Sequence, residues 1–244
     1  MRESGFDVSF RFGPFGAATH HYAPVCLNSL LYKTEKDLEQ ISRWMGHSAD
    51  AEKWSKRAEE RKRLITRYLW DEKSGWFFDY NLASGEKSTY RYATTFYPLW
   101  AAMATVEQAK AVVKNLPALD HPGGVAMSTQ ESEAQWDLPY GWGNIETLVV
   151  EGMRRYGFKT EADRVGYEFL SNVAENFRRD GNIREKYNVV TRSSEAHVEM
   201  GYAMNVVGFG WTNGAFLELL QDLPQEMRER LEREQDQPLA AAAK

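Results

Sequence analysis

The chain has 244 residues, of which 43% are hydrophobic and 27% are charged, and its formal net charge is −5. This balance is typical of a globular domain with a substantial core and excludes a disordered chain as the default interpretation. Positive residues are scattered among acids, so no basic stripe indicates nucleic acid or anionic lipid as a partner. The single cysteine, Cys26, excludes an internal disulfide and a multi-thiolate metal site, and its apolar neighbours predict a buried, inert thiol.

The sequence carries no signal peptide and no apolar run long enough to span a bilayer, so no membrane partner is expected. The chain also begins inside a motif, which leaves the compartment open. The cytoplasm is the expected location.

Apolar residues recur at helical spacing along most of the chain. A serine or threonine at the start and a glycine at the end mark several of these runs: Ser48 is a predicted N-cap and Gly157 a predicted helix end. One strand-like segment, residues 75–80, is predicted to form a small hairpin. The sequence therefore predicts a mainly α fold. In chain order the predicted helices cover 24–46, 48–68, 93–103, 105–116, 145–156, 160–177 and 210–233.

Four long segments between these helices, at 1–23, 70–92, 118–143 and 179–209, lack helical periodicity. Loops of this length are usually functional or disordered, and these are rich in Gly, Trp, Tyr, Asp and Glu. We therefore expect a helical scaffold whose loops converge on one site. Residues 1–225 are predicted to form one domain, and residues 226–244 a charged, alanine-rich tail that frays.

Distinctive motifs occupy these loops in a fixed order. They are ESGFDVSFRF (3–12), PGG (122–124) leading into QWDLPYGW (135–142), EKYN (185–188) followed by HVEMG (197–201), and GFGWTNG (208–214). In order and wording they resemble the trehalases of glycoside hydrolase family 37, whose typical members read ESGWDFSSRW, QWDxPNGW, EKYD and GFGWTNG. DYNL (79–82) and LNSLL (27–31) add to the resemblance, which extends from residue 3 to about residue 220.

The resemblance implies a partial catalytic domain. Family members also carry an upstream PGGRFxExYxWD signature and sugar-clasping arginines, and neither occurs in this sequence. The implied fold is therefore an incomplete (α/α)6 toroid, the C-terminal half of the catalytic domain, with a pocket held by the loops at one rim.

Two acids are the expected catalytic pair. An inverting glycosidase needs a protonated carboxyl group on one side of the scissile bond and an ionised one on the other, roughly 6.5–9.5 Å apart, so that a water molecule fits. The resemblance implies that Asp7 is the general acid. Its aromatic neighbours Phe6, Phe10 and Phe12 are expected to keep water away from it, as the protonated form requires. A turn or capping aspartate is the structural alternative.

The general base is expected at Glu199, because the Val-Glu-x-Gly wording recurs in some family members. Glu195 is the rival, since in other members the glutamate follows a glycine run that Ser193 and Ser194 could replace. A solvated surface acid is the alternative for either residue.

Six further residues are implied to bind the substrate by hydrogen bonding or stacking. Each has a structural alternative. The arginine can form a structural salt bridge. The residues of QWDLPYGW can form a buried aromatic corner, and the last tryptophan can belong to the hydrophobic core. The six are Arg11, Gln135, Trp136, Asp137, Trp142 and Trp211.

The function implied is inverting hydrolysis of a small α-linked glucoside, with the disaccharide α,α-trehalose as the first choice and glucose as product. No metal or organic cofactor is expected, because the five histidines lack metal-ligand spacing and the sequence has no phosphate-binding loop. The alternatives are another α-glycosidase of the same helical architecture, acting on a glucoside or mannoside, and an inactive sugar-binding module. A third is a truncated chain that persists as a homo-oligomer or with an N-terminal half fragment.

Overall fold

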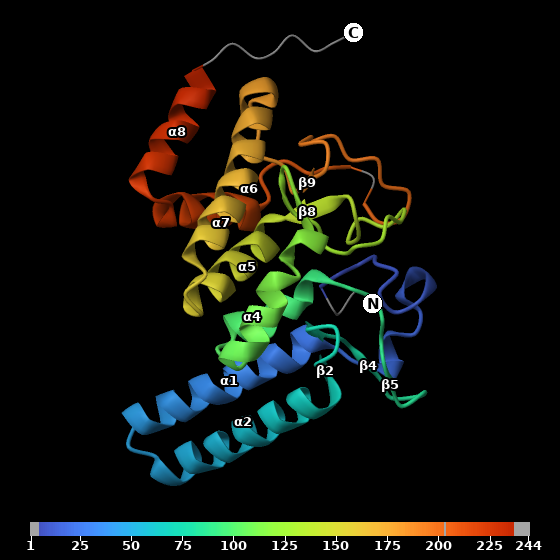
Figure 1. Cartoon of the computed structure of the whole chain (residues 1–244), viewed down its shortest axis with the longest axis vertical. Helices are drawn as coiled ribbons and strands as arrows, with labels where there is room; N and C mark the ends of the chain where they lie inside the picture. Colours follow the sequence, from blue (N-terminus) through green and yellow to red (C-terminus); the bar gives the residue numbers. More distant parts are fainter. Residues whose placement is uncertain (1–4, 203, 237–244) are drawn as a thin grey trace.

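The computed structural model describes residues 5–202 and 204–236. The mainly α character predicted from the sequence is confirmed (Figure 1). Glu3 and Ser4 of the first motif and residues 237–244 of the predicted tail lie outside the described residues. The helices are α1 (Val25–Trp44), α2 (Ser48–Tyr68), α3 (Tyr97–Trp100), α4 (Val106–Lys114), α5 (Gly143–Arg155), α6 (Lys159–Asp180), α7 (Gly210–Asp222) and α8 (Gln225–Asp236).

Short antiparallel strands connect the helices. The order is β1–β4–β5 in one small sheet, and β2–β3, β6–β7 and β8–β9 form pairs. The hairpin predicted at 75–80 is divided: β3 pairs with the preceding β2, which places Phe77 opposite Trp70, whereas β4 pairs with β1 and β5. The strands are β1 (Tyr22–Ala23), β2 (Trp70–Asp71), β3 (Trp76–Phe77), β4 (Tyr80–Asn81), β5 (Glu86–Lys87), β6 (Asp120–His121), β7 (Gly124–Val125), β8 (Tyr140–Trp142) and β9 (Lys186–Asn188).

Local chemistry explains where several helices begin and end. Thr105 starts α4 with a capping box: its hydroxyl accepts from the Gln108 N–H, and the Gln108 side chain accepts from the Thr105 N–H. Ser48 is the first residue of α2 rather than its N-cap, which is His47. The helix predicted over 210–233 is divided into α7 and α8 at Pro224, whose missing N–H cannot continue a helix.

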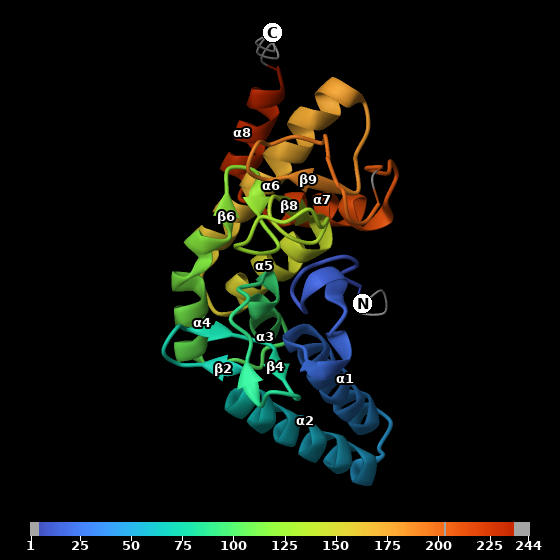
Figure 2. The same cartoon turned by 90° about the vertical axis from the view of Figure 1, so that its right-hand side faces the viewer.

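The helices form two groups joined through the centre of the molecule (Figure 1). The hairpin of α1 and α2 lies at one end, and α6, α7 and α8 lie at the other. The central helix α5 packs against α3, α6 and α7. Figure 1 and Figure 2 both place the N-terminal loop on the same side as β8, β9 and the segment before α7. The long loops therefore gather on one side of the scaffold.

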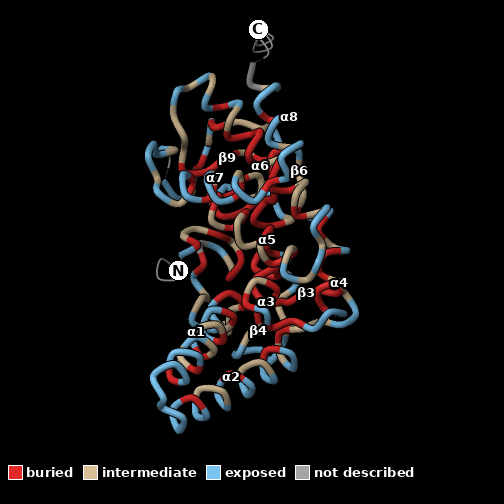
Figure 3. The backbone as a smooth tube through the Cα atoms, turned by 90° about the vertical axis from the view of Figure 1, so that its left-hand side faces the viewer, coloured by how far each residue is buried: buried red, intermediate tan, exposed pale blue. Residues whose placement is uncertain are grey.

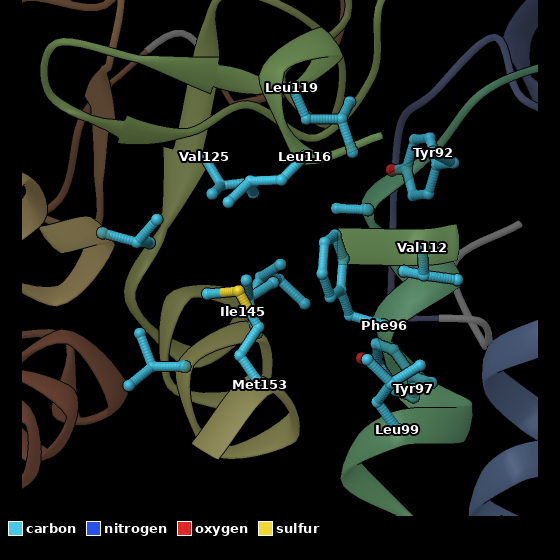
Figure 4. Close-up of a cluster of buried hydrophobic side chains, with 14 of the residues drawn as sticks. Tyr92, Phe96, Tyr97, Leu99, Val112, Leu116, Leu119, Val125, Ile145 and Met153 are labelled. Atoms are coloured by element: carbon cyan, nitrogen blue, oxygen red, sulfur yellow. The ribbon is translucent and has the colours of Figure 1, made fainter. Parts of the chain in front are cut away.

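The core runs through α3, α4, α5 and the loops beside them (Figure 4). Buried residues concentrate along this centre, whereas much of α2 is exposed (Figure 3). Leu99 of α3 and Met153 of α5 are both fully buried. Their helices approach closely because position 152 is glycine: a Cβ there would lie 3.1 Å from the backbone nitrogen of Trp100.

Two glycines of the PGG motif are also required by close packing. A Cβ at Gly123 would lie 2.5 Å from Nδ2 of Asn172, and a Cβ at Gly124 would lie 2.5 Å from Oε1 of Glu146. The Glu146 Oε1 atom accepts the N–H of Val125 at 2.7 Å. The β6–β7 hairpin is therefore held directly against α5 and α6.

The C-terminal helix α8 is packed rather than frayed over its described residues. Leu231 is buried, and the Tyr167 hydroxyl of α6 donates a hydrogen bond to Glu234. The predicted boundary at 225/226 thus falls at the first turn of a helix that adheres to the domain.

Part of the surface of α1 is apolar. Among the helices in 5–202 and 204–236, none combines the length and apolar character needed to cross a lipid bilayer. The apolar surface is an exposed stripe on a helix that also packs against α2 and α3. Its residues are Leu27, Leu30, Leu31, Ile41 and Trp44, continued by Met45.

Candidate active site

The loop that carries Asp7 is attached to the QWDLPYGW segment by hydrogen bonds to Asp137. This buried carboxylate accepts from the Ser9 hydroxyl at 2.9 Å, from the Phe10 N–H at 2.8 Å and from the Ser132 hydroxyl at 2.8 Å. The bonds to Ser9 and Phe10 join residues 127 to 128 positions apart. Carboxylates that accept several such bonds are held firmly in one orientation. Asp137 therefore fixes the loop of residues 7–10, called the acid loop below.

Gln135 connects the loops of the two candidate catalytic acids. Its Nε2 donates to the carbonyl oxygen of Asp7, and its Oε1 accepts the N–H of Tyr202 at 3.2 Å. The backbone N–H of Gln135 also donates to the carbonyl of Met200 at 3.2 Å, the residue that follows Glu199. Segments far apart in the sequence thus meet on the two sides of one buried glutamine. The Asp7 side chain is half-buried and Glu199 is exposed.

The glycine after Met200 makes this approach possible. Gly201 has a φ of 130°, which side-chain-bearing residues rarely adopt, and a Cβ there would lie 2.7 Å from Cδ of Gln135. The Glu-x-Gly wording therefore has a physical reason, because the chain must pass the glutamine closely.

Glu195, the rival base, lies in a different environment. It is exposed, its N–H donates to the Ser193 hydroxyl at 3.0 Å, and it lines a pocket of about 730 Å³ with Asp180, Arg184 and His197. Its own segment is attached to α6, since the Asn176 side chain accepts the N–H of Ser194 at 2.7 Å.

Arg11 is buried in an ion pair with Asp79. Its Nε lies 2.6 Å from Oδ2 of that carboxylate and its Nη2 lies 2.5 Å from Oδ1, a bidentate arrangement. The rings of Phe6, Phe12 and Tyr92 surround the guanidinium at 5.7, 4.9 and 4.6 Å. Two of the rings expected to shelter Asp7, those of Phe6 and Phe12, therefore pack around Arg11. The DYNL motif is explained as well, because its aspartate is the partner.

Three tryptophans of two motifs form one cluster. Trp136 and Trp142 stack with centroids 3.6 Å apart and planes within 2°, and Trp211 meets them edge-on at 6.1 and 5.8 Å. The stacked pair is buried and Trp211 is half-buried. The Nζ of Lys186 lies 5.3 Å from the Trp142 ring centroid and pairs with Glu185 at 3.0 Å. The EKYN motif thus supplies a buried ion pair behind the cluster.

Two residues of this region have no motif that marks them in the sequence. The hydroxyl of Tyr92 donates to the carbonyl of Trp136 at 2.6 Å, and burial raises its pKa well above the usual value. The Nδ2 of Asn205 donates to the carbonyls of Lys186 and Ser194, both at 2.7 Å. Neither was a candidate from the sequence, because each acts only through segments distant in the chain.

The described residues hold no group of three His, Cys, Asp or Glu side chains that could bind a metal ion. Gln135 brings the backbone of Asp7 close to the segment that follows Glu199. Two acidic residues on neighbouring segments are the residue types that can support proton transfer to and from a bound molecule.

Comparison with known proteins places this geometry in context. A family model described as Trehalase matches residues 1–224. A protein named probable trehalase from Eremothecium gossypii is 38% identical over 89% of this chain and 33% of its own length. The cytosolic neutral trehalase of Saccharomyces cerevisiae is 37% identical over 89% of this chain and 32% of its own length. The chain thus spans about a third of the length of these relatives.

Solved structures also resemble this chain. The neutral trehalase Nth1 from Saccharomyces cerevisiae superposes with a TM-score of 0.80 at 34% identity, over 94% of this chain and 42% of that one. A mannosylglycerate hydrolase from Thermus thermophilus has a TM-score of 0.64 at 22% identity over 81% of this chain and 47% of that one, a likeness of fold alone. The helical scaffold therefore matches part of the trehalase toroid, as the motifs predicted, and the chain belongs to the trehalase family.

Proposed function

We propose that the protein hydrolyses α,α-trehalose to glucose by an inverting mechanism, with Asp7 as general acid and Glu199 as general base. The observation that carries the proposal is the position of Gln135, which hydrogen-bonds to the Asp7 backbone on one side and to the segment after Glu199 on the other. Family membership supports the choice of substrate.

In this mechanism the Asp7 carboxyl group gives its proton to the glycosidic oxygen as the bond from that oxygen to the anomeric carbon breaks. The Glu199 carboxylate takes a proton from a water molecule whose oxygen attacks the same carbon from the opposite face. One glucose leaves with its α configuration intact, and the attacked one is released as the β anomer. The proton balance is closed, since one acid is deprotonated while the other is protonated.

Glu199 is preferred to Glu195 because of where its neighbours are bonded. Met200, next to Glu199, pairs with the segment that also contacts Asp7, whereas Glu195 follows a turn attached to α6. Glu195 also shares its pocket with the cationic side chains of Arg179 and Arg184.

The six residues expected to bind substrate receive positioning roles in this proposal. Five of them are buried and bonded to protein groups. We propose that they hold the loop of Asp7 and the tryptophan cluster in place and do not contact the sugar. Trp211, which is half-buried, is the member that we propose to contact the substrate. The five are Arg11, Gln135, Trp136, Asp137 and Trp142.

We also propose that the exposed apolar stripe on α1 is covered by protein, either a second copy of the chain or an N-terminal half fragment. An apolar face of this kind is costly to leave in water. Size-exclusion chromatography of wild type and of a Leu30→Glu, Trp44→Glu double variant tests it: the wild type is expected to self-associate or to retain an added fragment, and the variant is not.

Glucose release from trehalose by the purified chain tests the catalytic proposal, first alone and then with the remaining part of a relative supplied in trans. Asp7→Asn and Glu199→Gln are each expected to reduce turnover by about 10²–10⁴-fold. Glu195→Gln is the matched control and is expected to retain activity. Circular dichroism confirms that each variant is folded.

Equal turnover in wild type, Asp7→Asn and Glu199→Gln would eliminate the assignment. Loss in Glu195→Gln with normal turnover in Glu199→Gln would transfer the base to Glu195. Trehalose binding without glucose release, both by the chain alone and with the added part of a relative, would favour the sugar-binding module instead. Proton NMR of the fresh product, showing equal amounts of α- and β-glucose, checks inversion.

A further inference from the structure

A second pocket lies between α6, α8 and the β6–β7 hairpin, with a volume of about 750 Å³. Its walls come from α6, α8 and the β6–β7 hairpin, with Arg192 added from the turn after β9. Pockets of this size accommodate small organic ligands. None of the proposed catalytic residues lines it.

The guanidinium groups at the pocket are each matched by a carboxylate. Arg164 lies 2.6 Å from Asp120 and 2.8 Å from Glu168. Arg230 lies 2.9 Å from Glu234. The pocket therefore presents many hydrogen-bond donors and acceptors but little net charge.

Arg192 completes this pattern on the other wall. Its guanidinium lies 2.9 Å from Glu175 and donates to the Pro122 carbonyl at 2.8 Å and to the Ser171 hydroxyl at 3.1 Å. The residue has a φ of 57°, a strained conformation for a side chain of this size. Burial lowers the pKa of His121, which keeps its ring neutral at neutral pH and adds no charge.

Apolar surfaces alternate with these polar groups. Met227 and Pro122 line the pocket, and so does Tyr167, whose ring lies 4.6 Å from the carbon of the Arg230 guanidinium. A sugar ring has the complementary character, with hydroxyl groups around its rim that both donate and accept and with apolar C–H faces. An inorganic anion or a cation would instead need an excess of one sign of charge.

We propose that this pocket binds a neutral sugar, a monosaccharide or disaccharide, at a site distinct from the catalytic one. The paired arginines and carboxylates bind the hydroxyl groups, and Tyr167 and Met227 contact the ring. Because Arg192 belongs to the turn after β9, a bound sugar contacts the same segment that continues to the proposed base. Binding itself does not depend on the proposed hydrolysis.

Isothermal titration calorimetry with glucose tests the proposal on the full chain. Arg230→Ala removes an exposed guanidinium from the pocket wall, and Met227→Trp fills the pocket. Each is expected to weaken glucose binding at this site by about tenfold or more, as expected for the loss of charged hydrogen bonds or of space. Arg233→Ala is the matched control, because Arg233 is an exposed arginine of the same helix that does not line the pocket.

Asp7→Asn separates the two sites and is expected to leave this binding unchanged. Equal glucose affinity in wild type, Arg230→Ala and Met227→Trp would overturn the proposal. So would loss of all glucose binding in Asp7→Asn, which would assign the sugar to the catalytic site alone. Binding of inorganic phosphate without any binding of glucose would show an anion site and would likewise overturn the proposal.

Discussion

Arg11 and Asp79 form a bidentate ion pair across 68 residues of sequence, and both are only 2% exposed. The same carboxylate accepts the N–H of Val25, the first residue of α1, at 2.8 Å. One buried aspartate therefore joins the proposed acid loop, the first helix and the segment between β3 and β4. A charge left alone at this depth would be strongly destabilising.

Asp79→Asn is accordingly expected to lower the free energy of unfolding by about 3–5 kcal/mol, because it leaves the Arg11 guanidinium buried without its counter-charge. Urea denaturation followed by circular dichroism measures the change. Asp37→Asn is the control, since Asp37 pairs with Lys33 on the exposed face of α1. That change is expected to cost less than about 1 kcal/mol. Similar midpoints for the two variants would contradict a stabilising role for the buried pair.

Gly201→Ala is expected to impair catalysis by displacing Gln135. The new Cβ would require a left-handed φ and would lie 2.7 Å from Cδ of the glutamine. We expect glucose release to fall by about 10²-fold, a loss typical of small misplacements near reacting groups. Gly210→Ala is the control, because a Cβ at that position meets nothing within 4 Å. Unchanged turnover in Gly201→Ala would show that the hydrogen bonds of the Gln135 side chain do not position Asp7 and Glu199.

Glu146 is expected to make stability depend on pH. Burial raises the pKa of its carboxyl group well above the usual value, and the nearby acids Asp120 and Glu168 raise it further, against the lowering effect of the Val125 N–H. Since the folded pKa exceeds the unfolded one, the contribution is fully present below about pH 4 and is lost as the pH rises through the folded pKa. Glu146→Gln removes the ionisation and keeps the acceptor for Val125.

The melting temperature of wild type is therefore expected to fall relative to that of Glu146→Gln between pH 5 and pH 9, as measured by scanning calorimetry. Glu52→Gln, at an exposed position of α2, is the control and is expected to follow wild type across this range. Parallel curves for wild type and Glu146→Gln would contradict the prediction.

Cys26 is expected to resist alkylation in the native protein. Burial raises the pKa of its thiol despite the Arg11 guanidinium beside it, so little reactive thiolate is present at pH 8. Mass spectrometry after iodoacetamide treatment is expected to show slow modification without denaturant and complete modification in urea. Rapid labelling of the folded chain would contradict this expectation.

The helices were predictable from the sequence where an apolar stripe of helical period runs without interruption. Ala51, Ala58 and Ile65 of α2 are buried as their spacing indicates. Phe177, at the end of the stripe predicted for α6, is 48% exposed, because a period alone does not tell where the neighbouring elements end. The division of the last helix at Pro224 was missed for a related reason, since the apolar pattern continues across it.

The motifs located the loops of the candidate site but not the direction of every side chain in them. Asp137 is a hydrogen-bond acceptor for the loop that carries Asp7 because Ser9 and Phe10 reach it from 127 to 128 positions earlier in the sequence. Phe6 and Phe12 contact Arg11, whose burial depends on Asp79. Contacts between distant segments decide such roles, and no local pattern of residues carries that information.

The bonds from Gln135 and Asp137 to the first loop also limit how early in synthesis that loop can be held in place. The side chains that hold residues 7–10 are synthesised 127 to 128 positions after them. Closing a loop of this length carries an entropic cost that only later contacts repay. The α1–α2 hairpin can therefore form during translation, whereas the loop of residues 7–10 is held in place only after residues 135–137 have been synthesised.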